Sequence, residues 1–280
     1  MSPHDPFLCI SPYYDHMMNH VNYDRWCSVV CLLHESLPAP ARHLDVACGT
    51  GRLVAKLRRN GVVSFGVDRS HAMVQQARNS SGGEDSPMLT AHHHGVPPLC
   101  VGDARALPFA PAFHCLSCLF DSLNFLLTEE DIFKAFLEMK RVLLDPNLVY
   151  VDFVTERMVR DWYDQCAWTE TVAGTTFEWA SQYDARRRLA VLEVQTERGH
   201  TERYVERIYS KTALQRLLRR AGFYIVAWYD AQTGDTVTRH THRMELVLTS
   251  TRSRRFIRGV RKCLREKYPR LLYRVKDTWE

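Results

Sequence analysis

Apolar and polar residues follow two different periods along the chain. Between residues 41 and 160, short apolar runs of strand length alternate with segments whose apolar residues recur every three to four positions, as on one face of a helix. Strands that alternate with helices predict βαβ units, and therefore a parallel sheet with helices on both faces. The expected strands are 42–47, 62–68, 99–104, 113–122 and 147–154, and the expected helices are 52–60, 71–79 and 130–143.

The pattern changes after residue 160. Residues 161–209 contain four successive stretches typical of antiparallel strands, and the middle two turn through residues 184–188. A helical period then returns over residues 211–223. The expected strands are 168–174, 175–184, 189–199 and 202–210 in this insert, and 224–230 and 243–250 after it. The predicted fold is α/β: a doubly wound, seven-stranded, mostly parallel sheet with helices on both faces, plus an antiparallel β insert.

Two flanking segments complete the predicted organisation. Residues 1–40 contain a helix or helix pair over 13–36, which Pro38 and Pro40 end. Residues 251–280 have apolar residues at every fourth position, which indicates a helix packed on the body of the protein. These apolar residues are Phe256, Val260 and Leu264. The insert divides the core into 41–160 and 210–250.

Composition places the chain among ordinary globular proteins. It has 280 residues, of which 45% are hydrophobic and 25% are charged. No run of eighteen apolar residues occurs, so the sequence predicts no transmembrane helix, and the first residues lack the basic start and apolar core of a signal peptide. Nine cysteines scattered through apolar segments indicate reduced thiols. We therefore expect a soluble, cytoplasmic protein.

The net charge of +5 is unevenly distributed. Residues 251–280 hold eleven basic and three acidic residues of the chain's 37 and 32, which leaves 26 basic and 29 acidic residues elsewhere. The body is therefore mildly acidic, and the basic character belongs to the tail. Two interpretations stay open. The tail binds RNA or an anionic membrane surface, or it is a solvated basic helix that covers the domain.

A glycine-rich turn follows the first predicted strand, in the sequence HLDVACGTGRL of residues 43–53. Gly49 and Gly51 let the backbone pass close to a ligand, and the helix that starts here offers free N–H groups. A dinucleotide-binding turn would require a third glycine where this chain has Val54. Asp45 on the strand would repel a pyrophosphate, but it suits a ligand that carries an amino group and a sulfonium.

The segment LDVACGTG at 44–51 resembles the first motif of class I S-adenosylmethionine (SAM)-dependent methyltransferases, with Ala47 in place of one glycine. The other segments that carry this resemblance occur in the expected order along the chain. They are Asp68 at the end of the second strand, GDARALPF at 102–109, DSLNFL at 121–126 and LLRRAGF at 217–223.

This resemblance implies that the protein binds SAM as its cofactor. In the family, an acid at the position of Asp68 binds both ribose hydroxyls. The acid at Asp103 meets the adenine amino group, and the apolar residue at Ala104 packs on the ring. The residues implied in cofactor binding are Tyr14, Asp45, Ala47, Gly49, Thr50, Gly51, Asp68, Arg69, Asp103, Ala104 and Asp121.

The segment YYDHMMNHVNYDRW at 13–26 resembles the N-terminal lid of small-molecule members, which include amino-sugar N,N-dimethyltransferases. These members also carry an antiparallel insert after the fifth strand. The resemblance implies that Tyr14 contacts the methionine end of SAM, and that Tyr23 and Trp26 belong to the lid or the substrate pocket. Aromatic residues of the insert either pack the sheet or line the pocket. They are Phe177, Trp179 and Tyr183, of which Trp179 is the predicted pocket residue.

Methyl transfer is an in-line displacement at a carbon that the sulfonium already activates, so the enzyme mainly positions the acceptor and excludes water. Asp121 could accept a proton or hold an ammonium, and Asn124 could orient an amine or hydroxyl. These two are the predicted catalytic residues. His242 is a further candidate for the substrate pocket because it precedes the final strand. The segment DSLN differs from the Asn/Asp-Pro-Pro-Tyr/Phe motif of base N-methylation, which argues against a nucleic-acid base as acceptor.

Neither of two short motifs predicts a metal site. Cys115 and Cys118 have C-x-x-C spacing, but they lie in an apolar strand, which indicates buried thiols. The three histidines at 92–94 have no cluster of cysteines or acids to complete a site. We expect no metal cofactor.

The sequence therefore predicts a SAM-dependent methyltransferase that acts on a small-molecule acceptor, with an amine or a hydroxyl favoured. One alternative is an RNA or protein methyltransferase that docks through the basic tail, although nucleic acid is not the favoured partner. Another is a SAM-binding subunit without catalysis. A dehydrogenase is least favoured because the third glycine is missing. The acceptor atom and the oligomeric state stay open.

Overall fold

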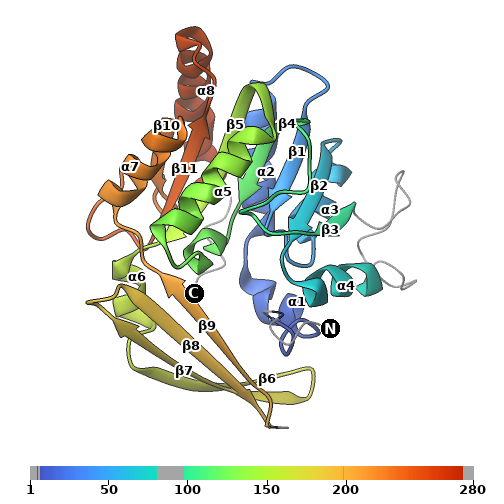
Figure 1. Cartoon of the computed structure of the whole chain (residues 1–280), viewed down its shortest axis with the longest axis vertical. Helices are drawn as coiled ribbons and strands as arrows, with labels where there is room; N and C mark the ends of the chain where they lie inside the picture. Colours follow the sequence, from blue (N-terminus) through green and yellow to red (C-terminus); the bar gives the residue numbers. More distant parts are fainter. Residues whose placement is uncertain (1–4, 6, 81–97, 198, 274–280) are drawn as a thin grey trace.

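The computed structural model describes residue 5 and residues 7–80, 98–197 and 199–273. Seven strands form one sheet in the order β10-β11-β5-β4-β1-β2-β3 (Figure 1). All neighbouring strands are parallel, except that β11 runs antiparallel to β10 and β5. The strands are β1 Arg42–Val46, β2 Val63–Asp68, β3 Leu99–Val101, β4 Phe113–Cys118, β5 Leu143–Val154, β10 Tyr224–Asp230 and β11 Arg243–Thr249. The predicted seven-stranded, mostly parallel sheet is confirmed.

Helices cover both faces of this sheet, because successive side chains of each strand point to opposite sides. On β5, Val149 and Val151 belong to the core beneath α5 and α7. Leu148 and Tyr150, one residue out of phase, belong to the core beneath α2, α3 and α8. The helices are α2 Tyr23–His34, α3 Arg52–Arg59, α4 His71–Ser80, α5 Glu129–Arg141, α7 Lys211–Ala221 and α8 Arg254–Tyr273.

Strands β3 and β4 end earlier than the sequence predicts. Strand β3 ends at Val101, and β4 ends at Cys118. After β4 the chain passes through Phe120 and Asp121, whose φ angles are 59° and 54°. This left-handed conformation cannot continue a strand, and a short 3₁₀ helix, η2 Ser122–Phe125, follows it.

The predicted antiparallel insert is a separate four-stranded sheet in the order β6-β7-β8-β9. Its strands are β6 Cys166–Val172, β7 Thr175–Asp184, β8 Leu189–Thr196 and β9 Thr201–Arg207. Figure 1 shows this insert sheet across one end of the seven-stranded sheet, at the same end as α4. A helix that the sequence did not predict, α6 Glu156–Trp162, precedes the insert, and the hydroxyl of Thr155 caps it by accepting a hydrogen bond from the Met158 N–H.

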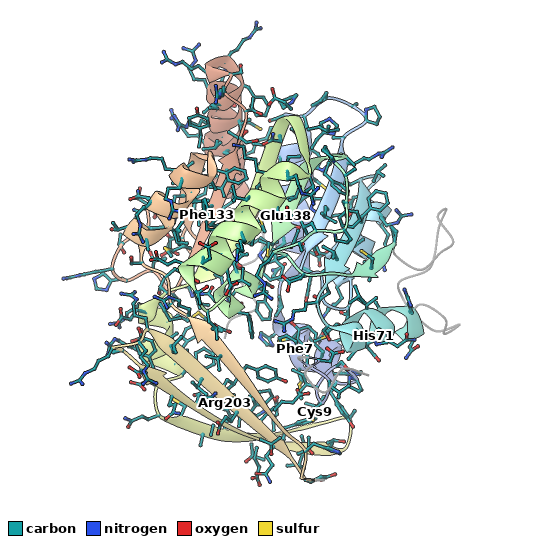
Figure 2. All side chains as sticks on the ribbon, viewed as in Figure 1. Phe7, Cys9, His71, Phe133, Glu138 and Arg203 are labelled. Atoms are coloured by element: carbon teal, nitrogen blue, oxygen red, sulfur yellow. The ribbon has the colours of Figure 1, made fainter. Side chains whose placement is uncertain are left out.

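The N-terminal helices are confirmed as a pair, α1 Tyr14–Met17 and α2, separated by the 3₁₀ turn η1 Met18–His20. The side chain of Asn22 caps α2 by accepting a hydrogen bond of 2.8 Å from the Arg25 N–H. The residues before α1 reach the insert sheet: Phe7 stacks on Tyr204 with ring centroids 4.9 Å apart. Figure 2 shows Phe7 and Cys9 between the insert sheet and the larger domain.

The basic tail forms α8, which packs on the sheet through the predicted face. Val260 and Leu264 are 1% exposed, and Phe256 lies beside them in the same core. Figure 1 shows α8 at the end of the molecule opposite the insert sheet. Among the helices of the described segments, none combines the length and apolar character that a membrane span requires.

Candidate functional site

A cavity of about 340 Å³ lies at the carboxyl ends of β1, β2, β3 and β4, where the insert sheet crosses the larger domain. Open parallel sheets bind their ligands at this edge, and the volume suits a small-molecule site. Most of its lining comes from the N-terminal segment, the turns after the four strands, α6, and strands β7, β8 and β9 of the insert, and Met73 of α4 and Val154 of β5 also contribute.

The glycine turn after β1 forms one wall of the cavity. Ala47 and Gly49 line it, and both have positive φ angles, 59° and 55°. Gly51 lies just outside the lining and is the N-cap of α3, with φ of 76°. A Cβ atom at Gly51 would lie 2.8 Å from Cδ1 of Leu99. Two requirements therefore favour glycine at this position, the left-handed backbone and the close approach of β3.

Asp68, the last residue of β2, places its carboxylate on the cavity wall. One carboxylate oxygen accepts a hydrogen bond of 2.7 Å from the Gly49 N–H, and the other accepts one of 2.7 Å from the Ser70 N–H. These bonds fix the carboxylate between the glycine turn and the start of α4. Burial raises the pKa of Asp68, while the hydrogen bonds from Ser70 and Gly49 act in the opposite direction.

The turn after β3 adds Asp103 and Ala104 to the lining, and Arg69 lies on the same wall. The carboxylate of Asp103 accepts a hydrogen bond of 2.7 Å from Arg105. This bond and the positive charge of Arg105 lower the pKa of Asp103. Asp103 therefore stays ionised, beside the apolar side chain of Ala104.

Asp45 does not line the cavity, although the sequence predicted that it would bind the ligand. It is buried beneath the glycine turn and accepts a hydrogen bond from the Ser117 hydroxyl on β4. The Ser117 hydroxyl also lies 3.0 Å from Nε2 of His43, whose Nδ1 lies 2.8 Å from the Ser64 hydroxyl. This polar network across β2, β1 and β4 was not predicted. Burial raises the pKa of Asp45 to about 7.

Thr50 also lies outside the cavity lining, where it joins the glycine turn to the N-terminal segment. Its hydroxyl donates a hydrogen bond of 2.6 Å to the Asp15 carboxylate in α1. The guanidinium of Arg52 donates to the carbonyls of Asp15 and Met18 at 3.3 and 3.2 Å. The N-terminal helices are thus attached directly above the turn.

Of the three aromatic residues predicted in the lid, only Tyr14 lines the cavity. Burial raises the pKa of its hydroxyl. Tyr23 lies beneath the Arg52 guanidinium, which is 4.4 Å from its ring centroid. Trp26 packs edge-on against Tyr23 at 5.3 Å and against Phe120 at 5.8 Å. The structure therefore places Tyr23 and Trp26 outside the cavity lining, where Trp26 packs on Phe120 and Tyr23 packs on Trp26.

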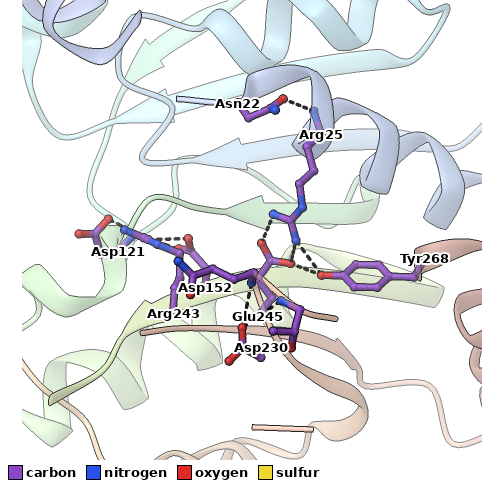
Figure 3. Close-up of polar contacts among 10 residues, drawn as sticks. Asn22, Arg25, Asp121, Asp152, Asp230, Arg243, Glu245 and Tyr268 are labelled. Carbon is purple, nitrogen blue, oxygen red and sulfur yellow. Dashed lines mark hydrogen bonds and ion pairs between the residues drawn. The ribbon is translucent and has the colours of Figure 1, made fainter. Parts of the chain in front are cut away.

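Asp121 lines the opposite end of the cavity, as part of a buried charged cluster (Figure 3). The Arg243 guanidinium donates hydrogen bonds to Asp121 at 3.1 Å and to Asp152 at 2.7 Å. The Asp121 N–H donates to the other oxygen of Asp152 at 2.9 Å. Phe120 and Asp121 both have left-handed backbone, which non-glycine residues adopt at a cost and which occurs often at functional sites.

Asn124 is fully buried and does not line the cavity. Its amide nitrogen donates a hydrogen bond of 2.8 Å to the Arg207 carbonyl, and its amide oxygen accepts one of 3.3 Å from the Val154 N–H. The prediction that Asn124 faces the acceptor is therefore corrected. Its amide is used to connect η2 to β9 and β5.

The insert contributes polar and aromatic side chains to the Asp121 end of the cavity. Trp179 on β7 lines it, as predicted, and stacks on Trp168 at 5.7 Å. Phe177 is buried in the sheet core, and neither it nor Tyr183 lines the cavity. Tyr204 and Glu206 from β9 also line it, as does Tyr163, which follows α6.

The sequence interpretation missed Arg243, Asp152, Tyr163 and Glu206. One signal could have identified Glu206, because the period of two along β9 places it on the same face as the buried Tyr204. The same period places Arg243 and Glu245 on one face of β11. A charged residue in phase with core residues is either paired or functional.

The remaining predicted residues lie away from the cavity or in a different role. His242 is not in the lining: its Nε2 lies 2.9 Å from an Asp161 oxygen, and its ring lies 4.8 Å from the Trp162 ring. Cys115 and Cys118 are buried and free, as expected, although Cys118 also lines the cavity, and burial raises the pKa of both thiols. The histidines at 92–94 lie outside the described residues.

Comparison with a family model gives the class of the domain. Residues 44–145 match the model described as "Methyltransferase domain". Among relatives, a Bacillus subtilis (strain 168) protein provisionally named methyltransferase YqeM is 27% identical over 169 residues, which are 60% of this chain and 63% of that protein. The match spans less than two thirds of the length of this relative, and the same holds for the other curated relative found, at 54%.

Solved structures show the same fold. A SAM-dependent methyltransferase from Clostridium acetobutylicum ATCC 824 aligns with a TM-score of 0.71 at 19% identity, over 85% of this chain and 96% of that one. SAM-bound CalS10, an amino pentose methyltransferase from Micromonospora echinaspora, aligns with a TM-score of 0.62 at 20% identity, over 85% and 96%. Residues 44–145 thus match a methyltransferase domain, and the fold of the chain is that of solved SAM-dependent methyltransferases.

Proposed function

We propose that this protein transfers the methyl group of SAM to a small-molecule acceptor. One observation carries the proposal: a single cavity joins the glycine turn, Asp68 and Asp103 at one end to Asp121 and the insert at the other. The first end has the groups that would hold SAM. The second end, which we call the acceptor end, has room and polar groups for the molecule that receives the methyl group.

The residues at the first end fit SAM chemically. The carboxylate of Asp68 is held rigid by two backbone N–H donors and still has lone pairs for ribose hydroxyls. Asp103 is ionised and lies beside Ala104, so this pair offers an acceptor for the adenine amino group and an apolar contact for its ring. Gly49 lets the ligand approach the backbone closely, and Tyr14 closes the methionine end.

SAM, when bound, supplies a methyl group on a positively charged sulfur. The protein's own task is to orient the acceptor and to exclude water. Arg243 fixes the carboxylate of Asp121, so Asp121 can position a hydroxyl or amine of the acceptor. Phe7 and Tyr204 stack on each other and both line the cavity, so the N-terminal segment and the insert together cover it.

Three observations favour a small molecule over a nucleic acid or a protein. The cavity is covered by the N-terminal segment and the insert sheet. The basic helix α8 lies at the opposite end of the molecule, so it does not frame this site (Figure 1). A structural relative, CalS10, is an amino pentose methyltransferase, which supports an amine or a hydroxyl on a small molecule as the acceptor.

The proposal is tested by calorimetric titration of the full chain with S-adenosylhomocysteine (SAH), with NAD as the control ligand. We expect SAH to bind and NAD not to bind. Asp68→Asn keeps the shape of the side chain but removes its charge, so we expect SAH to bind about tenfold or more weakly. The matched control is Glu138→Gln, which removes a charge outside the cavity. Binding of NAD alone, or of neither ligand, would overturn the proposal.

A further inference from the structure

Glu206 is the one acidic residue of the acceptor end for which the described structure provides no partner. Its side chain lines the cavity, and no described residue donates a hydrogen bond to its carboxylate or pairs with it as a cation. By comparison, Asp121 and Asp152 both accept from Arg243. A carboxylate enclosed in a protein is unfavourable unless it gains a partner, so Glu206 is placed to receive one from a ligand.

The charges of the side chains around Glu206 indicate which kind of ligand would bind there. Four charged side chains face one another here: Glu206 on β9, Asp121 after β4, Asp152 on β5 and Arg243 on β11. When all are ionised, three negative charges meet one positive charge. The phenol of Tyr163 is the further titratable group that faces Glu206. The acceptor end therefore has an excess of negative charge, and a cation bound there would offset it.

The walls around these charges indicate the rest of the ligand. Apolar side chains from three elements surround the acceptor end: Phe120 after β4, Met158 and Val159 from α6, and Leu192 and Trp179 from the insert. Such walls fit an apolar body of small size, with one charged group. They do not fit a highly charged molecule.

We propose that the acceptor is a small primary or secondary amine with an apolar body, and that Glu206 holds its ammonium group beside Asp121. An ammonium has no free lone pair, so the Glu206 carboxylate would take one of its protons, and the freed nitrogen lone pair would accept the methyl group of SAM, which would leave as SAH. This inference rests on the proposed function, and it narrows the acceptor from an amine or hydroxyl to an amine. Glu206 acts as the residue that selects the cation, because Asp121 is already paired with Arg243. An alcohol of the same shape would leave the carboxylate of Glu206 without a counter-charge.

Because Glu206 must be ionised to hold an ammonium group, amine binding should depend on pH. Burial raises the pKa of Glu206 well above that of an ordinary glutamate, Asp121 and Asp152 raise it further, and Arg243 lowers it. The carboxylate that holds the ammonium is therefore present only above this raised pKa. Amine binding should strengthen as the pH rises through the pKa of Glu206, and weaken again where the amine itself loses its proton.

The test compares cyclohexylamine with cyclohexanol, which has nearly the same shape but no charge, by ligand-observed NMR titration of the SAH-saturated protein. We expect cyclohexylamine to bind about tenfold or more tightly than cyclohexanol at pH 8. Glu206→Gln should abolish this preference without changing SAH affinity by more than about twofold. Glu193→Gln, the same change on an exposed residue of the insert that pairs with Arg203, should leave the preference intact.

Several outcomes would overturn the inference. Equal binding of the two probes, a preference that survives Glu206→Gln, or no binding of either probe to the SAH-saturated protein would each do so. The pH profile of the wild-type protein gives a measurement that needs no variant: cyclohexylamine affinity that does not rise with pH anywhere below the pKa of the amine also contradicts the role of Glu206. If SAH itself does not bind, the result contradicts the proposed function, on which the role of Glu206 depends.

Discussion

Two arginines with mostly buried side chains, Arg25 on α2 and Arg243 on β11, are paired in different ways (Figure 3). Arg25 donates two hydrogen bonds, of 2.5 and 2.6 Å, to the single carboxylate of Glu245, and a third of 2.8 Å to the Tyr268 hydroxyl. This cluster has one positive and one negative charge. It connects α2 and α8 to the sheet, and none of its residues lines the cavity.

Arg243, two residues before Glu245, lies in the other kind of cluster. It meets two carboxylates, Asp121 and Asp152, and Glu206 adds a third that faces the cavity. Of these two clusters, the one with excess negative charge borders the cavity. A buried cluster with equal positive and negative charge stabilises the fold, whereas a cluster with an excess of one charge beside a cavity indicates where a ligand of the opposite charge is expected.

The largest effect should come from breaking the balanced cluster. Arg25→Met would leave Glu245, which is 0% exposed, without its counter-charge. We expect the free energy of unfolding to fall by about 3–5 kcal/mol, as when one partner of a buried pair is removed. Urea unfolding at pH 7 measures this. The control is Lys56→Met, because the pair of Lys56 with Asp24 is exposed and should contribute about 1 kcal/mol or less. Equal losses of stability in the two variants would contradict the conclusion that the pair of Arg25 and Glu245 stabilises the fold.

A smaller loss of folding stability is expected when the cluster with excess negative charge loses Arg243. Arg243→Met removes the partner of Asp121 and Asp152, and we expect the free energy of unfolding to fall by about 2–4 kcal/mol at pH 7.5, since Asp121 lines the cavity, where water can reach it. Without Arg243 the folded carboxyl groups bind protons more readily than the unfolded ones. The variant should therefore regain stability as the pH falls toward 5. Urea unfolding at both pH values measures this, and a loss as large as that of Arg25→Met would remove the distinction.

The smallest of the three effects on folding stability should be an increase. Glu206→Gln removes a carboxylate that destabilises the folded protein, so we expect the free energy of unfolding to rise by about 1 kcal/mol at pH 8. The sign follows from the pKa of Glu206, which is raised in the folded state. Wild-type stability decreases as the pH rises above the unfolded pKa of glutamate, and the variant lacks this decrease. The gain should thus be absent near pH 4. A variant that is less stable at pH 8 would indicate that Glu206 stabilises the fold.

The sequence predicted the α/β fold because the periods of its apolar residues are local properties. The same is true of the cofactor end of the cavity. Gly49, Asp68 and Asp103 each lie at or just after the carboxyl end of a strand, so parallel topology alone brings them to one edge of the sheet. Each of the three residues can therefore be located from the short motif at the end of its own strand.

The acceptor end could not be predicted in this way. Arg243 contacts Asp121 across 122 residues of sequence, and Glu206 reaches the cavity only because the insert sheet crosses the larger domain. No local period encodes such contacts. The error for Asn124 has the same origin, since its position in the chain suggested the acceptor end, but its amide is bonded to Arg207 and Val154.

The most direct test of the account is a crystal structure of the protein with SAH bound. We expect adenine beside Ala104, the ribose hydroxyls on the Asp68 carboxylate, and the homocysteine sulfur directed toward Asp121 and Glu206. That arrangement would place the departing methyl group at the acceptor end. SAH bound elsewhere, or in the cavity with its sulfur directed away from Asp121 and Glu206, would contradict the claim that this one cavity brings cofactor and acceptor together.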